Sequence, residues 1–168
     1  MTEDGLIQTG IAGLDEILMG GIPRGNAILL KGVTGSGTNL MGIEFIYRGI
    51  TQFGKSGLIV VFETSPDKLI RDTAKFGWHL DELRLEKKLQ IIFTSPQVFE
   101  QELRSTDSLL LEAATEISAQ RIFIDGVAMF DQIATRGGSE PASYRDLLHQ
   151  HTSSLHFGGQ GSWKQSFI

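Results

Sequence analysis

The chain has 168 residues, 40% of them hydrophobic and 21% charged, which indicates one globular domain and excludes a disordered or fibrous protein. Its 15 basic and 20 acidic residues give a net charge of -5, which argues against an electrostatically driven nucleic-acid surface. The sequence has no cysteine, which excludes disulfides and thiolate metal sites, and its longest apolar runs are too short to span a bilayer. We therefore expect a soluble protein of the cytoplasm.

Short apolar runs alternate with amphipathic segments along the chain, a rhythm that is typical of βαβ units. The runs are rich in Ile, Leu, Val and Phe without strict alternation, which predicts parallel strands covered on both faces. The predicted strands are 26–31, 57–63, 89–94 and 121–125. The sequence therefore predicts an α/β fold with a mostly parallel sheet.

Helical signals fill the intervals between these strands. Apolar residues recur at helical spacing from Leu40 to Ile50, so the glycine-rich segment before them leads directly into a helix. Ser65 and Pro66 are a typical N-cap and first helical residue, and Gly77 can end that helix in the left-handed conformation. The remaining predicted segments are a short charged stretch at 81–88, helices at 108–120 and 140–155, and a tail without pattern at 157–168.

The most informative motif lies between the first predicted strand and the first predicted helix. Its glycines follow the spacing of the P-loop, G-x-x-x-x-G-K-[ST], whose backbone amides and helix N-terminus cradle phosphate. Thr38 stands in place of the Lys that reaches the β- and γ-phosphates, and Asn39 stands in place of the hydroxyl that ligates Mg²⁺. The predicted phosphate-binding residues are Gly32, Val33, Thr34, Gly35, Ser36, Gly37, Thr38 and Asn39.

Two carboxylates follow predicted strands at the sheet edge where α/β proteins bind ligands. Glu63 ends the second strand and can orient or deprotonate a water molecule there; alternatively, it interacts with the dipole of the helix that starts at Ser65. Asp125 ends the apolar run RIFID in the manner of a Walker B aspartate, which holds Mg²⁺. The amide oxygen of Asn39 can also reach the metal. The candidate site therefore has Glu63 as catalytic residue and Asn39 and Asp125 as metal ligands.

Two basic residues near the loop in sequence can replace the missing lysine. Lys31 closes the first predicted strand, and Arg24 lies in the turn before it. Either side chain can instead face solvent. The two outcomes differ in function, because a replaced charge would restore the phosphate contact of the P-loop lysine and an absent charge would leave it missing.

From about Thr9 to Leu155 the chain resembles the N-terminal part of a KaiC-like ATPase domain of the RecA superfamily. The resemblance rests on TGIAGLD at 9–15, GGIPRG at 20–25, the P-loop, FETSP at 62–66, FGW at 76–78 and IFID at 122–125. It implies a RecA-like P-loop fold, which is a three-layer sandwich, and it implies that the chain is a homologue of a circadian clock protein. It further implies ATP with Mg²⁺ as cofactors and hexameric rings with nucleotide at the subunit interfaces.

The chain departs from this family pattern in three places. The first is the pair of substitutions in the P-loop, and the second is Glu63-Thr64, where KaiC itself has two glutamates. The third is that the resemblance implies further core strands after Leu155, one of them inserted between the P-loop strand and the Walker B strand. We therefore expect a partial nucleotide-binding domain at 1–156 and a tail at 157–168 that is foreign to the fold, as in a truncated or frameshifted product.

The function expected from these observations is a KaiC-like domain that binds ATP weakly and hydrolyses it negligibly. One alternative is a functional ATPase in which Lys31, Arg24 or a partner subunit supplies the charge. Another is a non-catalytic subunit in a homo- or hetero-oligomer with KaiC-like relatives. We expect neither a membrane nor a nucleic acid as a partner.

Overall fold

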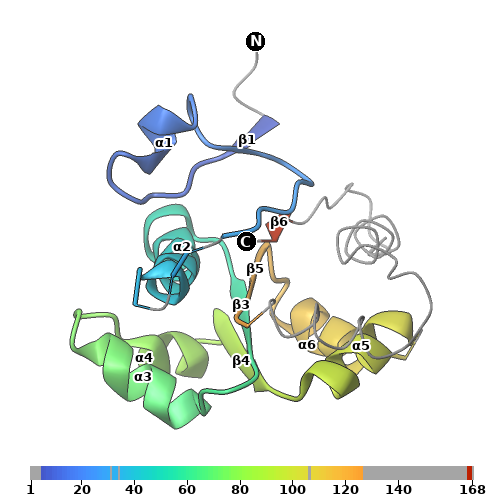
Figure 1. Ribbon diagram of the computed structural model, residues 1–168. Coiled ribbons are helices and arrows are strands. Elements are labelled where there is room, and N and C mark those ends of the chain that lie inside the picture. The colour runs from blue at the N-terminus through green and yellow to red at the C-terminus, as the bar shows by residue number, and fades with distance from the viewer. Residues whose placement is uncertain (1–4, 31, 34, 106, 127–165, 168) are drawn as a thin grey trace.

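In the computed structural model, which describes residues 5–30, 32–33, 35–105, 107–126 and 166–167, helices cover both faces of a parallel sheet (Figure 1). The sheet contains β3 (Gly57–Val61), β4 (Leu89–Phe93), β5 (Arg121–Ile124) and β6 (Ser166–Phe167) in the order β4-β3-β5-β6. Each neighbouring pair is parallel. An antiparallel pair, β1 (Leu6–Ile7) and β2 (Ile22–Pro23), lies apart from this sheet.

Three of the six described helices begin at a serine N-cap. The described helices are α1 (Leu14–Ile17), α2 (Thr38–Phe53), α3 (Pro66–Ala74), α4 (Leu80–Leu85), α5 (Pro96–Arg104) and α6 (Leu109–Glu116). The serine hydroxyls of Ser65, Ser95 and Ser108 each accept a hydrogen bond from a backbone N–H in the first turn of α3, α5 and α6. Gly54, with a φ of 63°, ends α2 in the left-handed conformation.

Two apolar cores lie on the two faces of the sheet, so that the domain has three layers. Ile59 and Val61 of β3 belong to the core under α2, α3 and α4, whereas Leu58 and Val60 belong to the core under α5 and α6. All four side chains are fully buried. Figure 1 shows α2 to α4 on one side of the strands and α5 with α6 on the other. The prediction of strands covered on both faces is confirmed.

The prediction of a strand at 26–31 is wrong. Within 26–30 only Ala27 forms an isolated bridge, and Lys31 lies outside the described residues. A strand requires a run of paired backbone, and beyond the bridge at Ala27 residues 26–30 pair with no strand in the described part of the chain. Ile28 nevertheless packs against the core under α2, whereas Leu29 is exposed.

Other predicted elements are confirmed with shifted limits. The second, third and fourth predicted strands end one or two residues earlier than expected, and the charged stretch at 81–88 overlaps the helix α4. Helix α5 and the short elements before residue 26 were not predicted, and neither was an element in the tail that contributes β6. The predicted helix at 140–155 lies outside the described residues. Among the helices that are described, none has the length and hydropathy needed to cross a bilayer.

Candidate functional site

The glycine-rich loop leads into the N-terminus of α2, as predicted. Gly37 is the N-cap residue with a φ of 86°, and Gly35 has a φ of 84°, both in the left-handed region that favours glycine. Inside the loop, the N–H of Ser36 donates to the carbonyl of Val33 over 3.0 Å. The described loop residues are exposed, and the first turn of α2 carries no acidic side chain. The loop therefore presents backbone to solvent at the positive end of a helix dipole.

Gly32 shows how tightly this loop turns back on itself. A Cβ added at Gly32 would collide with the side chain of Ser36 and would lie 2.8 Å from Cγ2 of Thr38. With these rotamers of Ser36 and Thr38, the loop has room only for glycine at its first position. Thr34, another residue of the predicted loop, lies outside the described residues.

The two substituted positions open the first turn of α2. Thr38 is half-buried and Asn39 is exposed. The hydroxyl of Thr38 donates to Oδ1 of Asn39 over 3.5 Å, so the oxygen proposed as a metal ligand already faces a donor. Both side chains are neutral, and the positive charge that the P-loop pattern supplies at this turn is absent from both positions.

The packing of α2 against β5 determines which sheet edge the loop occupies. A Cβ added at Gly49 would collide with Arg121, and a Cβ added at Gly42 would collide with the ring of Phe123. The helix therefore runs antiparallel to β5, with its N-terminus toward the carboxyl end of the strand. Because Asp125 follows that end of β5, the loop and Asp125 lie at the same edge of the sheet.

Glu63 and Asp125 are brought together at this edge. Asp125 continues the pairing of β5, since its N–H donates to the carbonyl of Val60 over 2.9 Å. Burial raises the pKa of the half-buried Asp125 carboxyl, and the negative charge of Glu63 raises it further, against a hydrogen bond from the N–H of Gly126. Glu63 is exposed and follows β3 by two residues instead of ending it. A cation between these carboxylates would relieve their repulsion.

The structure does not bring Arg24 to the loop. The N–H of Arg24 donates to the carbonyl of Gly5 over 2.9 Å, next to the β1–β2 pair. Its charge lies close enough to Arg121, at the amino end of β5, to lower the pKa of that guanidinium. Arg24 therefore lies toward the end of the strand opposite the loop. Lys31, the other candidate replacement, lies outside the described residues.

The residues at this edge fit a polyphosphate better than they fit its metal ion. The loop offers backbone donors at a helix N-terminus, which suits phosphate oxygens. For Mg²⁺ it offers one neutral amide oxygen, from Asn39, and the carboxylate of Asp125. Within the described residues, no cluster of three or more His, Asp or Glu side chains is arranged to hold a metal.

Comparison with known proteins gives consistent similarities. Residues 7–158 match the family described as the KaiC ATPase. The circadian clock oscillator protein KaiC of Prochlorococcus marinus (strain MIT 9313) is 38% identical over 133 residues, covering 75% of this chain and 27% of that protein. KaiC of Rippkaea orientalis is 41% identical over 133 residues, with 75% and 26% covered. The chain thus spans about a quarter of the length of these curated relatives.

A solved structure shows the same arrangement. The crystal structure of a KaiC-like protein from the hyperthermophilic archaeon Pyrococcus horikoshii OT3 matches with a TM-score of 0.72 and 28% sequence identity. The match covers 97% of this chain and 68% of that one. The predicted fold class, an α/β RecA-like domain with a mostly parallel sheet, is confirmed by this similarity.

Proposed function

Because the chain belongs to the KaiC ATPase family, we propose that it is a P-loop domain that binds ATP with Mg²⁺ weakly or not at all and hydrolyses it negligibly. The observation that carries this proposal is the first turn of α2, where Thr38 and Asn39 occupy the positions of the P-loop lysine and hydroxyl. Arg24, the described candidate for a replacement charge, lies toward the other end of β5.

Each residue of the site has a defined part in this function. The backbone amides of the loop from Gly32 to Gly37 would bind phosphate oxygens, and Asn39 and Asp125 would hold Mg²⁺. The metal, when bound, neutralises charge that develops on the phosphates. Glu63 would orient the attacking water. All of these groups bind or orient, and none supplies the positive charge of the lysine.

The expected loss of affinity for ATP follows from the missing positive charge. Loss of one charge-assisted contact to phosphate costs about 1.5–3 kcal/mol, which is roughly ten- to a hundredfold in affinity. The effect on hydrolysis is larger, because a positive charge at this position acts most strongly on the transition state. Weak binding with negligible turnover is therefore the expected combination.

Calorimetric titration of the purified chain with ATP and Mg²⁺ tests the proposal. We expect a dissociation constant above the micromolar range and no sustained release of phosphate. A sub-micromolar constant or steady turnover would overturn the proposal and favour the functional ATPase.

The double substitution Thr38→Lys with Asn39→Thr tests the cause of the deficit. It should raise the affinity for ATP roughly ten- to a hundredfold, since it restores one charge-assisted contact and the metal-binding hydroxyl. Thr51→Lys is the matched control, because Thr51 is exposed near the opposite end of the same helix. Equal affinities of the double variant and the unaltered chain would mean that these two positions do not limit binding.

A second candidate function is a non-catalytic subunit that assembles with other KaiC-like chains. The observation that favours it is the outer edge of β5, which pairs with β6 only at Arg121 and Ile122 in the described part of the chain. An edge that is incompletely paired can accept a strand from another molecule. Co-purification with a KaiC-like relative supports this function, and a monodisperse monomer at high concentration contradicts it.

A further inference from the structure

We propose that Arg121 is a positioning residue for the phosphate-binding loop, because its guanidinium ties the N-terminal segment, from which the chain continues through β2 toward the loop, to α2, which follows the loop. The inference rests on the proposed function, since it concerns the same loop. It assigns a role to a residue at the opposite end of β5 from the candidate site.

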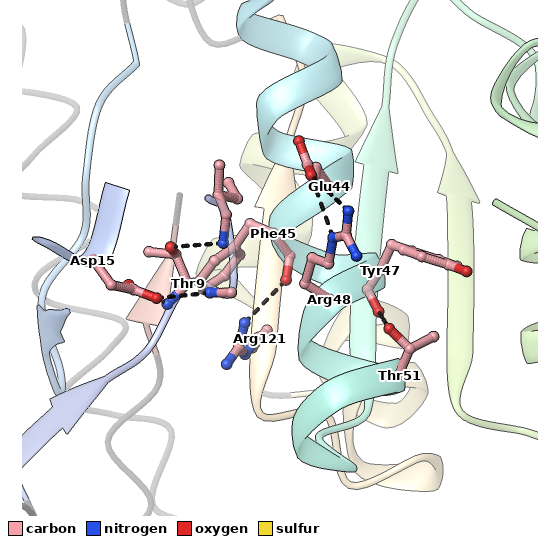
Figure 2. Close-up of polar contacts among 10 residues, drawn as sticks. Thr9, Asp15, Glu44, Phe45, Tyr47, Arg48, Thr51 and Arg121 are labelled. Atoms are coloured by element: carbon pink, nitrogen blue, oxygen red, sulfur yellow. Dashed lines mark hydrogen bonds and ion pairs between the residues drawn. The ribbon is translucent and has the colours of Figure 1, made fainter. Parts of the chain in front are cut away.

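The guanidinium of Arg121 is enclosed between the N-terminal segment and α2. Arg121 is 2% exposed and opens β5. Its Nη1 donates to the backbone carbonyl of Phe45 in α2 over 3.0 Å, and its Nη2 donates to the carbonyl of Gln8 over 2.7 Å. The guanidinium carbon lies 4.4 Å from the centroid of the Phe45 ring and 5.2 Å from that of Phe53. Figure 2 shows the side chain directed at Phe45, with Thr9 and Asp15 on the N-terminal side.

The bond to Gln8 fixes the segment that precedes the loop. Gln8 directly follows β1, which pairs with β2 through Ile7 and Ile22, and the chain runs from β2 into the loop. Asp15 fastens the same segment, as its carboxylate accepts from the N–H of Thr9 over 2.7 Å and from the N–H of Gly10 over 3.0 Å. The upstream end of the loop is thus held through this N-terminal layer.

The bond to Phe45 fixes the segment that follows the loop. Phe45 lies two turns into α2, whose first residue is Thr38, and a helix transmits its position along its length. Gly10 of the N-terminal segment also lies against α2, since a Cβ added there would lie 2.9 Å from Cβ of Arg48 and 3.0 Å from Cε2 of Phe53. Arg121 therefore sets the spacing between the two ends of the loop.

The spacing between the two ends of the loop affects phosphate binding more in this chain than in a P-loop that has its lysine. Residues 26–30, which lead into the loop, are held by an isolated bridge at Ala27 and by the packing of Ile28 against the core under α2. Without the lysine, affinity for phosphate depends on how well the backbone amides are held in place. Fixed ends keep those amides in one arrangement.

The chemistry of Arg121 favours a geometric role over a stabilising one. Burial lowers the pKa of the guanidinium to about 10, and Asp15 opposes this through its charge without a hydrogen bond to Arg121. Within the described residues, Nε of Arg121 has no hydrogen-bond partner. Desolvation of a buried charge is costly, so the burial of this guanidinium is weak evidence that it stabilises the fold. What an apolar side chain cannot supply is the pair of directed bonds to the two flanking segments.

The test compares Arg121→Leu, which removes both bonds, with Arg121→Lys, which keeps the charge. Arg104→Leu is the matched control, because Arg104 is an exposed arginine whose Nη2 pairs with Glu100 over 3.0 Å. Two quantities are measured below the unfolding temperature. One is amide hydrogen exchange at Thr9 and at Met41, whose N–H donates to Gly37 over 2.9 Å. The other is the affinity for ATP with Mg²⁺ in the chain that also carries Thr38→Lys and Asn39→Thr.

We expect Arg121→Leu to speed exchange at Thr9 and Met41 while Ile59, in the centre of β3, keeps its protection. The affinity for ATP should fall about three- to tenfold, as the binding-competent arrangement of the loop becomes less populated. Arg121→Lys should recover part of both effects, and it also serves as the test if Arg121→Leu fails to fold. Arg104→Leu should change neither quantity.

Two results would overturn the proposal. The first is that Arg121→Leu shows the same exchange at Met41 and the same affinity for ATP as Arg104→Leu. The second is that Arg121→Leu speeds exchange at Ile59 as much as at Met41, which indicates a purely structural role. The failure of the proposed function is a separate outcome. If the repaired chain with Arg121 intact binds no ATP, nucleotide binding is refuted, whereas exchange at Met41 still decides whether Arg121 positions the loop.

Discussion

The contact between Gly42 and Phe123 sets how closely α2 approaches the sheet, and Gly42→Ala would disturb it. An added Cβ would come well inside 3.0 Å of the Phe123 ring, which is 5% exposed. Overpacking a filled core costs about 1–3 kcal/mol, whereas Ala in a helix interior is better than Gly by about 1 kcal/mol. We therefore expect a net loss of up to about 2 kcal/mol. At roughly 2–4 °C per kcal/mol for a chain of this size, Tm should fall by several degrees.

Thermal and urea unfolding of four proteins checks this reasoning: the unaltered chain, Gly42→Ala, Phe123→Leu and the double variant. Because Phe123→Leu removes the ring that the new methyl group meets, the two substitutions should not be additive. A favourable coupling energy of about 0.5–3 kcal/mol is expected for residues in direct contact. A rise in Tm on Gly42→Ala alone, as for an unhindered helix position, or strictly additive effects would refute the contact.

Two further predictions concern Asp125 and the cap of α5. Asp125→Asn should raise Tm at pH 7, because the folded pKa of Asp125 lies above its ordinary value of 3.8 and the buried carboxylate is therefore a cost at neutral pH. Protonated Asp125 carries no such cost, so the rise in Tm should vanish below about pH 3.8 and should grow as the pH rises through the folded pKa of Asp125. A rise in Tm that does not depend on pH would contradict this. Ser95→Ala should lower the free energy of unfolding by about 1 kcal/mol, since the Ser95 hydroxyl accepts from the N–H of Val98 over 3.2 Å. Ser65→Ala, at the equivalent cap of α3, should cost a similar amount, and an unchanged urea midpoint in both variants would argue against these caps.

The central strand of the sheet could be predicted because burial on both faces is visible in composition. Residues 57–61 are continuously apolar, and in β3 the alternating residues serve the two cores. Local caps were equally readable, as Ser65 and Pro66 show for α3. The same pair recurs at Ser95 and Pro96, so α5 was missed although its signal was present.

The predicted strand at 26–31 is absent for a different reason. An apolar run predicts a buried segment, but a strand exists only where a second backbone pairs with it, and here Ala27 and Leu29 are exposed. Ile28 does pack against a core, and the described part of the sheet offers this segment no neighbouring strand. Pairing of this kind depends on residues distant in sequence, which no local pattern reports.

Long-range placement also explains what could not be foreseen at the site. Glu63 and Asp125 interact because β3 and β5 are parallel neighbours in a register that pairs Gly57 with Arg121. The bond between Arg121 and Gln8 spans 113 positions in sequence. In the sequence, Arg121 stands out as an arginine at the start of an otherwise apolar strand. That position indicates an unusually buried side chain, but it does not identify the hydrogen-bond partners of the guanidinium.

The glycines of the loop and the two residues after them carry separate information. Gly32 is favoured because a Cβ there would meet the side chains of Ser36 and Thr38, and Gly37 is favoured by its left-handed backbone. Both preferences come from the way the loop folds onto α2, so they persist whether or not a nucleotide binds. The glycine spacing therefore predicts the shape of the loop, and the capacity to hold a polyphosphate must be judged from positions 38 and 39. Since Asn39 is exposed and Thr38 only half-buried, Lys and Thr can be introduced there without disturbing that shape, and the repaired chain measures the chemistry separately from the fold.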